Sequence, residues 1–252
     1  MWLVLSPILT DGSIQQVKAP GHQRKRCCYV DFLATGVAVC AALRNRVSRA
    51  DGVRRLSNFT ITDLVVRDNR IAGAVGFDIT TGEPLAIEAK AVIIASGGLT
   101  QLYARSSASL NMAGESTALA LRAGARLVDI EFVQFFPIGH LAPRMVGIDP
   151  VTWDPFRVKL GGRLLNGNRE EFVENYGSSD SGTYTTTRDQ LTYAIFKEVA
   201  AGRGSPNGGA YLSFEHLPEA TLRETMGPAM DVFARNGIDL TKGPVEVAPI
   251  AH

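Results

Sequence analysis

The spacing of apolar residues near the start of the chain predicts a helix. From Thr35 to about Arg49 the apolar residues fall three or four apart, with arginines between them. This period is typical of a helix with one apolar stripe on its surface. We therefore expect a half-buried helix over these residues.

A meander of three strands is expected next. The stretches 59–67 and 70–79 are rich in β-branched and other apolar residues, and an Asp-Asn pair at 68–69 separates them. Asp and Asn tolerate positive φ, which suits a tight hairpin turn. A Thr-Gly pair at 81–82 then turns the chain into 85–89. We predict that these three short strands are antiparallel.

The run AVIIASGG at 91–98 is continuously apolar, unlike the alternating strands before it. Such a run is expected of a parallel strand that is covered on both faces. After its Ser-Gly-Gly turn, the stretch 115–125 has helical spacing and a glycine near its end. This order resembles the carboxyl edge of a dinucleotide-binding sheet. A purely structural turn explains the glycines equally well, and the helix dipole alone explains Glu115.

The region 138–245 is predicted to be a separate α+β unit. Thr187 and Gln190 form a capping box before a strongly periodic helix. A last helix over roughly 219–235 contains Gly-Pro at 227–228, which should kink or split it.

Composition excludes several classes of function. The chain has 252 residues and a net charge of +1, so neither nucleic acid nor an anionic membrane is expected as the main partner. The opening stretch is apolar but short, which argues against a signal peptide or membrane span. Three cysteines, two of them adjacent, suit neither a disulfide framework nor a zinc site, so we expect reduced thiols in a cytosol-like compartment.

Sequence motifs with a known mechanism are few. GxGxxG, the P-loop, HExxH and the nucleophile elbow do not occur in the sequence. The four histidines are scattered without metal-ligand spacing, and each one singly is expected to be a surface or core residue.

Several blocks together carry a resemblance that no single motif carries. Residues 91–139 contain ASGG, AGES and QFFPIG in the order of Ala-Thr-Gly-Gly, Thr-Gly-Asp-Gly and Gln-Phe-His-Pro-Thr-Gly. DFLATGVAVCAALRNRV, GGRLLNGNREEFVENY, RDQLTYAIFKEVAAGRG and VEVAPIAH add four further blocks. In this pattern the chain resembles the fumarate reductase/succinate dehydrogenase flavoprotein family, which also includes L-aspartate oxidases.

The resemblance implies a fold and an activity. The fold is an α/β FAD-binding (Rossmann-like) domain, incomplete here, with an inserted α+β capping domain. It divides the chain into a partial FAD-binding domain (1–137), a capping domain (138–245) and a return strand (246–252). The activity is that of an FAD-dependent oxidoreductase acting on CH–CH bonds, which moves a hydride between flavin N5 and a carboxylic acid. An iron–sulfur protein is a possible electron-transfer partner, and the expected location is cytoplasmic or peripheral to a membrane through that partner.

The matching positions supply candidate site residues. His252 corresponds to a histidine that binds a substrate carboxylate. Glu115 keeps the carboxylate of the family's Gly-Asp pair, with one extra methylene. The positions that the resemblance places beside FAD are Ser96, Gly97, Gly98, Gly114 and Glu115.

Departures from the family pattern concern the substrate. Phe136 replaces a substrate-binding histidine, and Ile138 replaces a threonine. The proton-transferring arginine falls on Val158, and Arg157, one position earlier, is the candidate to replace it. Both losses favour a ligand that is more apolar or differently charged than succinate or fumarate.

The stretch DIEFVQFFPIGH at 129–140 is expected to leave the flavin domain and enter the cap. Ile130 and Phe132 should lie in the core, and the half that contains Phe136 should face the substrate.

Two family blocks have no counterpart in the chain: the amino-terminal GxGxxG unit and a carboxyl-terminal block with a second catalytic arginine. The sequence is therefore interpreted as a piece of a longer chain that alone binds FAD weakly or not at all. The alternative function is a non-catalytic chain or an interaction module.

Overall fold

The structure is a computed structural model that describes residues 11–17, 23–30, 35–145, 151–177, 187–227 and 229–252. The chain forms two compact units. The first contains 1–60 and 76–85, and the second contains 61–75 and 86–252. The predicted opening segment 1–10 and the start of the DFLATG block lie outside the described residues. The predicted domain boundaries at 137 and 245 stay a prediction.

The first unit contains the predicted helix. Strand β1 (Gln16–Val17) pairs antiparallel with β2 (Cys27–Cys28), and α1 (Thr35–Ser48) follows. The helix is confirmed, but its half-burial is wrong: no residue of α1 is buried, and Val37 is 71% exposed. An apolar stripe is buried only where another element covers it, and no described element does so here.

The three-stranded meander is confirmed. Strands β3 (Phe59–Arg67), β4 (Arg70–Asp78) and β5 (Pro84–Glu88) form a sheet in the order β3-β4-β5. Asp68 and Asn69 have φ of 50° and 58°, as a two-residue hairpin turn between right-twisted strands requires. The boundary between the two units passes through this meander.

The parallel strand predicted over 91–98 is wrong. These residues form no strand in the structure, and Ile93 is 91% exposed. A strand needs hydrogen-bonded neighbours, and no described strand pairs with this segment. The chain continues through a short 3₁₀ helix, η1 (Thr100–Leu102), into α2 (Glu115–Arg122).

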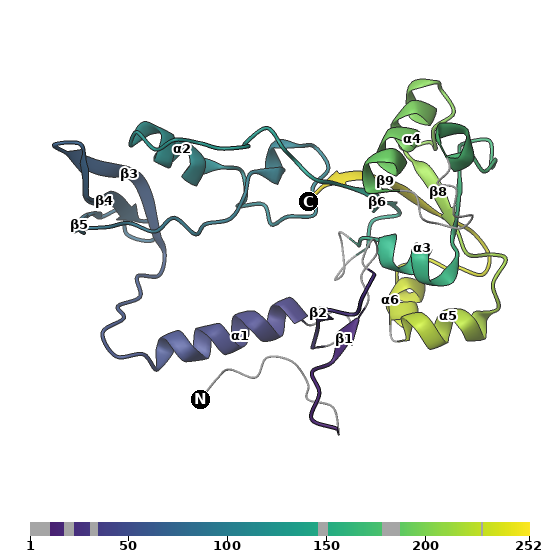
Figure 1. Ribbon diagram of the computed structural model, residues 1–252, viewed down its shortest axis with the longest axis horizontal. Helices are drawn as coiled ribbons and strands as arrows, with labels where there is room; N and C mark the ends of the chain where they lie inside the picture. The colour runs from purple at the N-terminus through teal and green to yellow at the C-terminus, as the bar shows by residue number, and fades with distance from the viewer. Residues whose placement is uncertain (1–10, 18–22, 31–34, 146–150, 178–186, 228) are drawn as a thin grey trace. The chain divides into compact units, whose positions relative to one another are not determined.

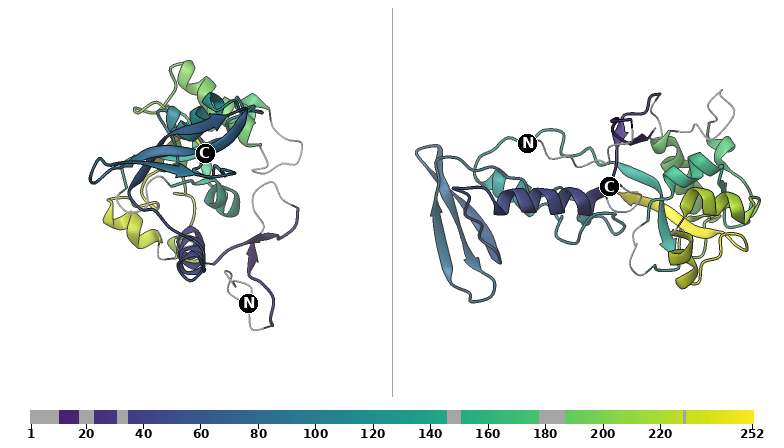
Figure 2. Two further views of the ribbon diagram at one scale, coloured as in Figure 1. Left: turned by 90° about the vertical axis from the view of Figure 1, so that its left-hand side faces the viewer. Right: turned by 90° about the horizontal axis from the view of Figure 1, so that it is seen from below.

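A four-stranded antiparallel sheet organises the second unit, in the order β6-β9-β8-β7. Figure 1 shows α4 on one side of this sheet and α3, α5 and α6 on the other, and Figure 2 gives two further views. The strands are β6 (Phe135–Ala142), β7 (Arg163–Leu165), β8 (Ala210–Ser213) and β9 (Val245–Ala251). The helices are α3 (Asp154–Leu160), η2 (Val173–Tyr176), α4 (Arg188–Ala200), α5 (Glu219–Met226) and α6 (Ala229–Arg235).

The predicted capping box and helix break in this unit are confirmed. The capping box of Thr187 and Gln190 is present at the start of α4. The helix predicted over 219–235 is split into α5 and α6 at Gly227, as the Gly-Pro pair indicated. The segment 246–252, predicted to be a return strand, falls largely in β9, which pairs with both β6 and β8.

Trp153 lies at the centre of the core. It is fully buried, and its ring lies 5.0 Å from that of Phe233 and 6.2 Å from that of Phe214, centroid to centroid. Its indole N–H donates to Nδ1 of His140 at 3.2 Å, and the other ring nitrogen of His140 is hydrogen-bonded to the carbonyl of Pro143. His140 is therefore a core histidine, as expected.

In the stretch 129–140, the prediction that Ile130 and Phe132 lie in the core is wrong. Phe132 is 78% exposed and Ile130 is 44% exposed, so the first half is not core. Ile138 is fully buried and Phe136 is 8% exposed, because β6 enters the sheet only at residue 135.

A buried carboxylate fixes the carboxyl end of α4. Glu198 is 2% exposed and accepts hydrogen bonds from Arg203 at 2.7 and 2.9 Å, from Tyr176 at 2.6 Å and from Asn166 at 3.0 Å. The hydrogen bonds from Arg203, and then those from Tyr176 and Asn166, lower the pKa of Glu198 to about 2. None of the described helices is long and apolar enough to cross a membrane.

We expect Glu198→Gln to lower the free energy of unfolding by on the order of 2–3 kcal/mol, because it removes the charge that pairs with Arg203 and replaces one of the two acceptor oxygens with an NH2 donor. Urea denaturation at pH 7 measures the change. Glu219→Gln is the matched control, since Glu219 pairs with Arg223 on the surface and should contribute less than about 1 kcal/mol.

Acidification provides a second measurement on the same variant. The pKa of Glu198 lies below its ordinary value of 4.5 in the folded chain, so its stabilisation is present above that pH and is lost towards pH 2. The difference in stability between wild type and Glu198→Gln should shrink over this window. A difference in stability that does not depend on pH would contradict the ionised Glu198 in this hydrogen-bond network.

Candidate functional site

The pairing of β6 with β9 brings two of the predicted site residues together. Phe136 of β6 lies opposite Ile250 of β9, and the backbone N–H of His252 donates to the carbonyl of Gln134 at 2.9 Å. The rings of Phe136 and His252 meet edge to face, with centroids 4.3 Å apart. Two residues far apart in sequence are thus neighbours through one ladder of backbone hydrogen bonds.

Arg188 is the third member of this group, and it comes from the first turn of α4. Its guanidinium carbon lies 4.3 Å from the centroid of the Phe136 ring, in cation–π geometry. Its Nε donates to the carboxylate of Asp154 at 3.1 Å. The Asp154 side chain is 6% exposed, so this carboxylate holds the guanidinium from the buried side. Among the described residues, no other hydrogen bond of the Arg188 side chain is recorded, and its side chain is 39% exposed.

The environment of His252 keeps it neutral. Partial burial of the ring, and then the nearby charge of Arg188, lower the pKa of His252 below its ordinary value of 6.5. Its Nδ1 lies 2.6 Å from the hydroxyl of Ser107. When this hydroxyl donates to Nδ1, the proton of the neutral ring is on Nε2, which can donate to an anion.

Ser107 reaches His252 because its segment extends the edge of β9. The N–H of Ser107 donates to the carbonyl of Ala251 at 2.9 Å, and the N–H of Ala251 donates to the carbonyl of Arg105 at 2.9 Å. Arg105 also donates to the carbonyls of Gly208 and Asn207, both at 3.1 Å. The segment that follows the Ser-Gly-Gly turn is therefore attached to the end of β9.

The glycines predicted to contact a cofactor form a close-packed turn. Gly97 and Gly114 have φ of 93° and 86°, in the left-handed region. A Cβ on Gly97 would lie 3.1 Å from the Met112 side chain, and one on Gly114 would lie 2.8 Å from Cβ of Leu99. The turn is thus brought against the start of α2, where Gly114 is the N-cap and Glu115 is in the first turn.

This arrangement fits FAD. The close-packed turn at Gly97, Gly98 and Gly114 fixes the backbone that leads into α2, whose first N–H groups favour an anion such as a phosphate. Glu115 is exposed, so its carboxylate can accept hydrogen bonds from cofactor hydroxyl groups. Ser96 is exposed beside them.

Arg157 is placed differently from the other candidates. It lies on α3 and is 4% exposed, whereas its neighbour Val158 is 42% exposed. Arg157 follows Asp154 by three positions, so both lie on one face of α3. Asp154 pairs with Arg188, whose guanidinium lies over the ring of Phe136.

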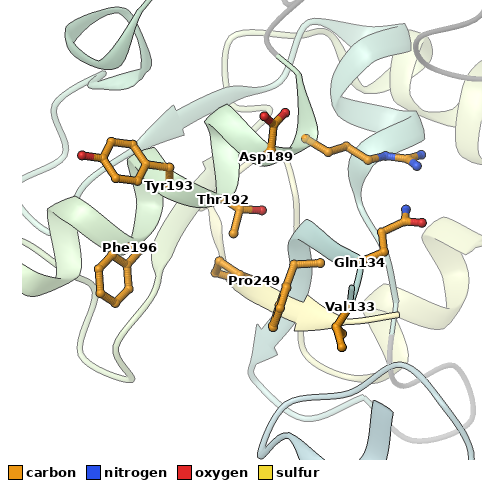
Figure 3. A pocket seen from close by; sticks show the side chains of 9 residues that line it. Val133, Gln134, Asp189, Thr192, Tyr193, Phe196 and Pro249 are labelled. Atoms are coloured by element: carbon orange, nitrogen blue, oxygen red, sulfur yellow. The ribbon is translucent and has the colours of Figure 1, made fainter. Parts of the chain in front are cut away.

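A cavity of about 670 Å³ adjoins the site between α4 and the facing ends of β6 and β9. Figure 3 shows Tyr193, Thr192 and Phe196 on one wall, and Val133, Gln134 and Pro249 on the other. Arg188, Asp189 and Phe135 complete the lining.

Arg188, Asp154 and Ser107 were not among the predicted site residues. Arg188 could have been found, because it directly follows the N-cap Thr187 and stands first in the RDQLTYAIFKEV block. Asp154 and Ser107 carry no local signal, since their roles depend on contacts across 34 and 145 positions of sequence.

Comparison with known proteins identifies the family to which the chain belongs. The family model described as "FAD binding domain" matches residues 5–251. A fumarate reductase (CoM/CoB) polypeptide of Methanothermobacter marburgensis is 36% identical, over 96% of this chain and 43% of its own length. L-aspartate oxidase 2 of Ralstonia nicotianae is 29% identical, over 96% of this chain and 43% of its own.

A solved structure of a related protein has a similar fold. A variant of E. coli quinol fumarate reductase superposes with a TM-score of 0.81 at 26% identity, over 96% of this chain and 43% of that chain. The chain therefore spans less than half the length of these relatives.

We expect Arg188→Met to raise the pKa of His252, because it removes a neighbouring positive charge. The pKa should stay below the ordinary histidine value, since the larger cause, partial burial of the ring, remains. NMR titration of the histidine ring protons measures this, with His252→Gln to assign the signal. Arg163→Met, on a surface arginine paired with Glu171, is the control that should change nothing. An unchanged pKa of His252 in the Arg188→Met variant would contradict the proximity of Arg188 to His252.

Proposed function

Because this chain belongs to the FAD binding domain family, we propose that it is the flavin-contacting and substrate-holding part of an FAD-dependent oxidoreductase that acts on a small organic acid. The observation that carries the proposal is the contact of Phe136 with both Arg188 and His252. The similarity to fumarate reductase and L-aspartate oxidase sequences supports the same class of reaction.

The cofactor would be held by backbone more than by side chains. We assign Gly97, Gly98 and Gly114 to close contact with FAD, Ser96 to the edge of the same surface, and Glu115 to a cofactor hydroxyl. Bound FAD supplies the two-electron step, in which a hydride passes between flavin N5 and a carbon of the substrate.

The substrate carboxylate would bind to Arg188 and His252. The guanidinium of Arg188 offers two parallel N–H donors beyond the one that Asp154 occupies, which suits a carboxylate. Neutral His252, oriented by Ser107, adds one N–H donor. Phe136 excludes water between them and so strengthens both interactions.

The proton that accompanies the hydride needs a group at the substrate. Sequence resemblance points to Arg157 for this role, and we retain Arg157 as a supporting residue behind Asp154 on the buried face of α3. Arg188 is supported for the direct contact, because it lies against Phe136 and lines the cavity. A partner that carries iron–sulfur centres would exchange electrons with the flavin, as the resemblance implies.

Retention of FAD tests the cofactor assignment. We expect Gly114→Ala to weaken FAD binding at least tenfold. An alanine would be strained at the positive φ of this position, and its Cβ would lie 2.8 Å from Cβ of Leu99. Gly124→Ala is the matched control: it has a nearly identical φ of 85° at the other end of α2, with nothing within 4 Å. Flavin absorbance after reconstitution and dialysis of the full-length protein measures both. A wild-type protein that stays colourless after reconstitution would overturn the flavoenzyme proposal.

Arg188→Met tests the substrate assignment. We expect it to keep FAD and to lower the rate at which unsaturated carboxylic acids reoxidise the reduced flavin by at least 100-fold, since a charged hydrogen-bonding partner of the carboxylate is lost. Stopped-flow absorbance of the flavin measures the rate. Arg163→Met, on the surface at β7, should retain the wild-type rate. Equal rates in the Arg188→Met variant and the wild type would remove Arg188 from the site.

A further inference from the structure

The cavity beside Arg188 has a polar end and an apolar end. Gln134 lies towards one end, and Tyr193 and Phe196 lie along α4 at the other (Figure 3). Arg188, in the first turn of α4, belongs to the polar end. A volume of about 670 Å³ is within the range of sites that bind drug-sized molecules, roughly 300–1,000 Å³. It exceeds what a four-carbon diacid needs.

The polar end can bind one anionic group. Among the described residues that line the cavity, Arg188 is the only cationic side chain. Asp189 does not compete for it, because hydrogen bonds from Thr187 and from backbone N–H groups at the start of α4 hold its carboxylate and lower its pKa. Figure 3 shows that carboxylate directed away from Pro249 and Val133.

Thr192 adds an independent indication of a ligand. It follows Arg188 by four positions, so both side chains lie on one face of α4. Its hydroxyl is buried and has no hydrogen-bond partner among the described residues. An unsatisfied buried hydroxyl is unfavourable, and rotation towards a bound carboxylate would satisfy it.

The apolar end offers little to a second charge. Phe135, Pro249, Val133 and Phe196 are apolar, and the hydroxyl of Tyr193 is the polar group that the described lining residues add at this end. The side chains of Tyr193 and Phe196 are 52% and 63% exposed, so a ligand of ring size would bury apolar surface on both. A second carboxylate placed here would lose part of its hydration and could gain at most this hydroxyl as a donor.

We infer that this cavity binds a monocarboxylic acid with an apolar, ring-sized body: its carboxylate on Arg188 and Thr192, its body between Phe196 and Pro249. The inference rests on the proposed function, in which Arg188 holds the substrate carboxylate, and it specifies the substrate class. Phe136 also disfavours a second carboxylate, because it places an apolar ring beside Arg188 in place of a polar donor.

Calorimetric titration of the FAD-loaded full-length protein tests the inference with three saturated acids: 3-phenylpropanoate, propanoate and succinate. We expect 3-phenylpropanoate to bind at least tenfold more tightly than either of the others. Phe196→Ala should weaken 3-phenylpropanoate about fivefold and leave propanoate unchanged. Thr192→Val should weaken both monocarboxylates to a similar degree, because it removes only the hydroxyl. Phe77→Ala, the same substitution on an exposed phenylalanine of β4, is the matched control.

The outcomes separate this inference from the proposed function. Succinate binding as tight as that of 3-phenylpropanoate, or an unchanged affinity in Phe196→Ala, would overturn the inference. If unsaturated diacids such as fumarate then reoxidise the flavin and need Arg188, the proposed function still stands. If 3-phenylpropanoate binds as expected but neither its unsaturated analogue cinnamate nor fumarate reoxidises the flavin, the cavity assignment stands and the proposed function fails.

Discussion

The antiparallel pairing of β6 with β9 is the constraint on which the site depends. It aligns Phe136 with Ile250 and leaves His252 beside Gln134, so two side chains far apart in sequence share one end of a sheet. The same pairing provides the surface on which α4 lies, and α4 carries Arg188 in its first turn. A shift of one residue in the register would turn Phe136 to the opposite face and separate it from both partners.

Two buried carboxylates hold α4 at its two ends. Asp154 accepts a hydrogen bond from Arg188 at the amino end, and Glu198 accepts hydrogen bonds from Arg203 near the carboxyl end. Ion pairs that are only partly buried add little net stability, because the loss of hydration offsets the attraction. Their specific geometry does restrict how α4 can slide or rotate over the sheet. The position of the Arg188 guanidinium therefore depends on contacts along the whole helix and not on its own rotamer alone.

Local turns and caps could be predicted from the sequence, because they depend on neighbouring residues alone. The parallel strand predicted at 91–98 fails because an apolar run states only that a segment can be buried. Strand formation also needs a hydrogen-bonding neighbour, which no described strand provides here. The site was predictable only in part, because it also depends on pairing between distant segments. Phe136 and His252 could be named from their blocks, but their contact arises from pairing between distant strands. Nothing local indicates that Asp154 holds Arg188.

Phe136 shows how one apolar ring can change the kind of ligand that a charged site accepts. In the proposed site its ring contacts both Arg188 and His252, so a carboxylate bound there would lose water on that side and be attracted more strongly. A ring offers no hydrogen bond, so a second carboxylate that reached it would be desolvated without compensation. The two effects act together on selectivity: the first favours any acid, and the second disfavours only diacids. In the proposed site, the ring at position 136 and the apolar walls near Phe196 would therefore favour the same class of ligand from two sides of Arg188.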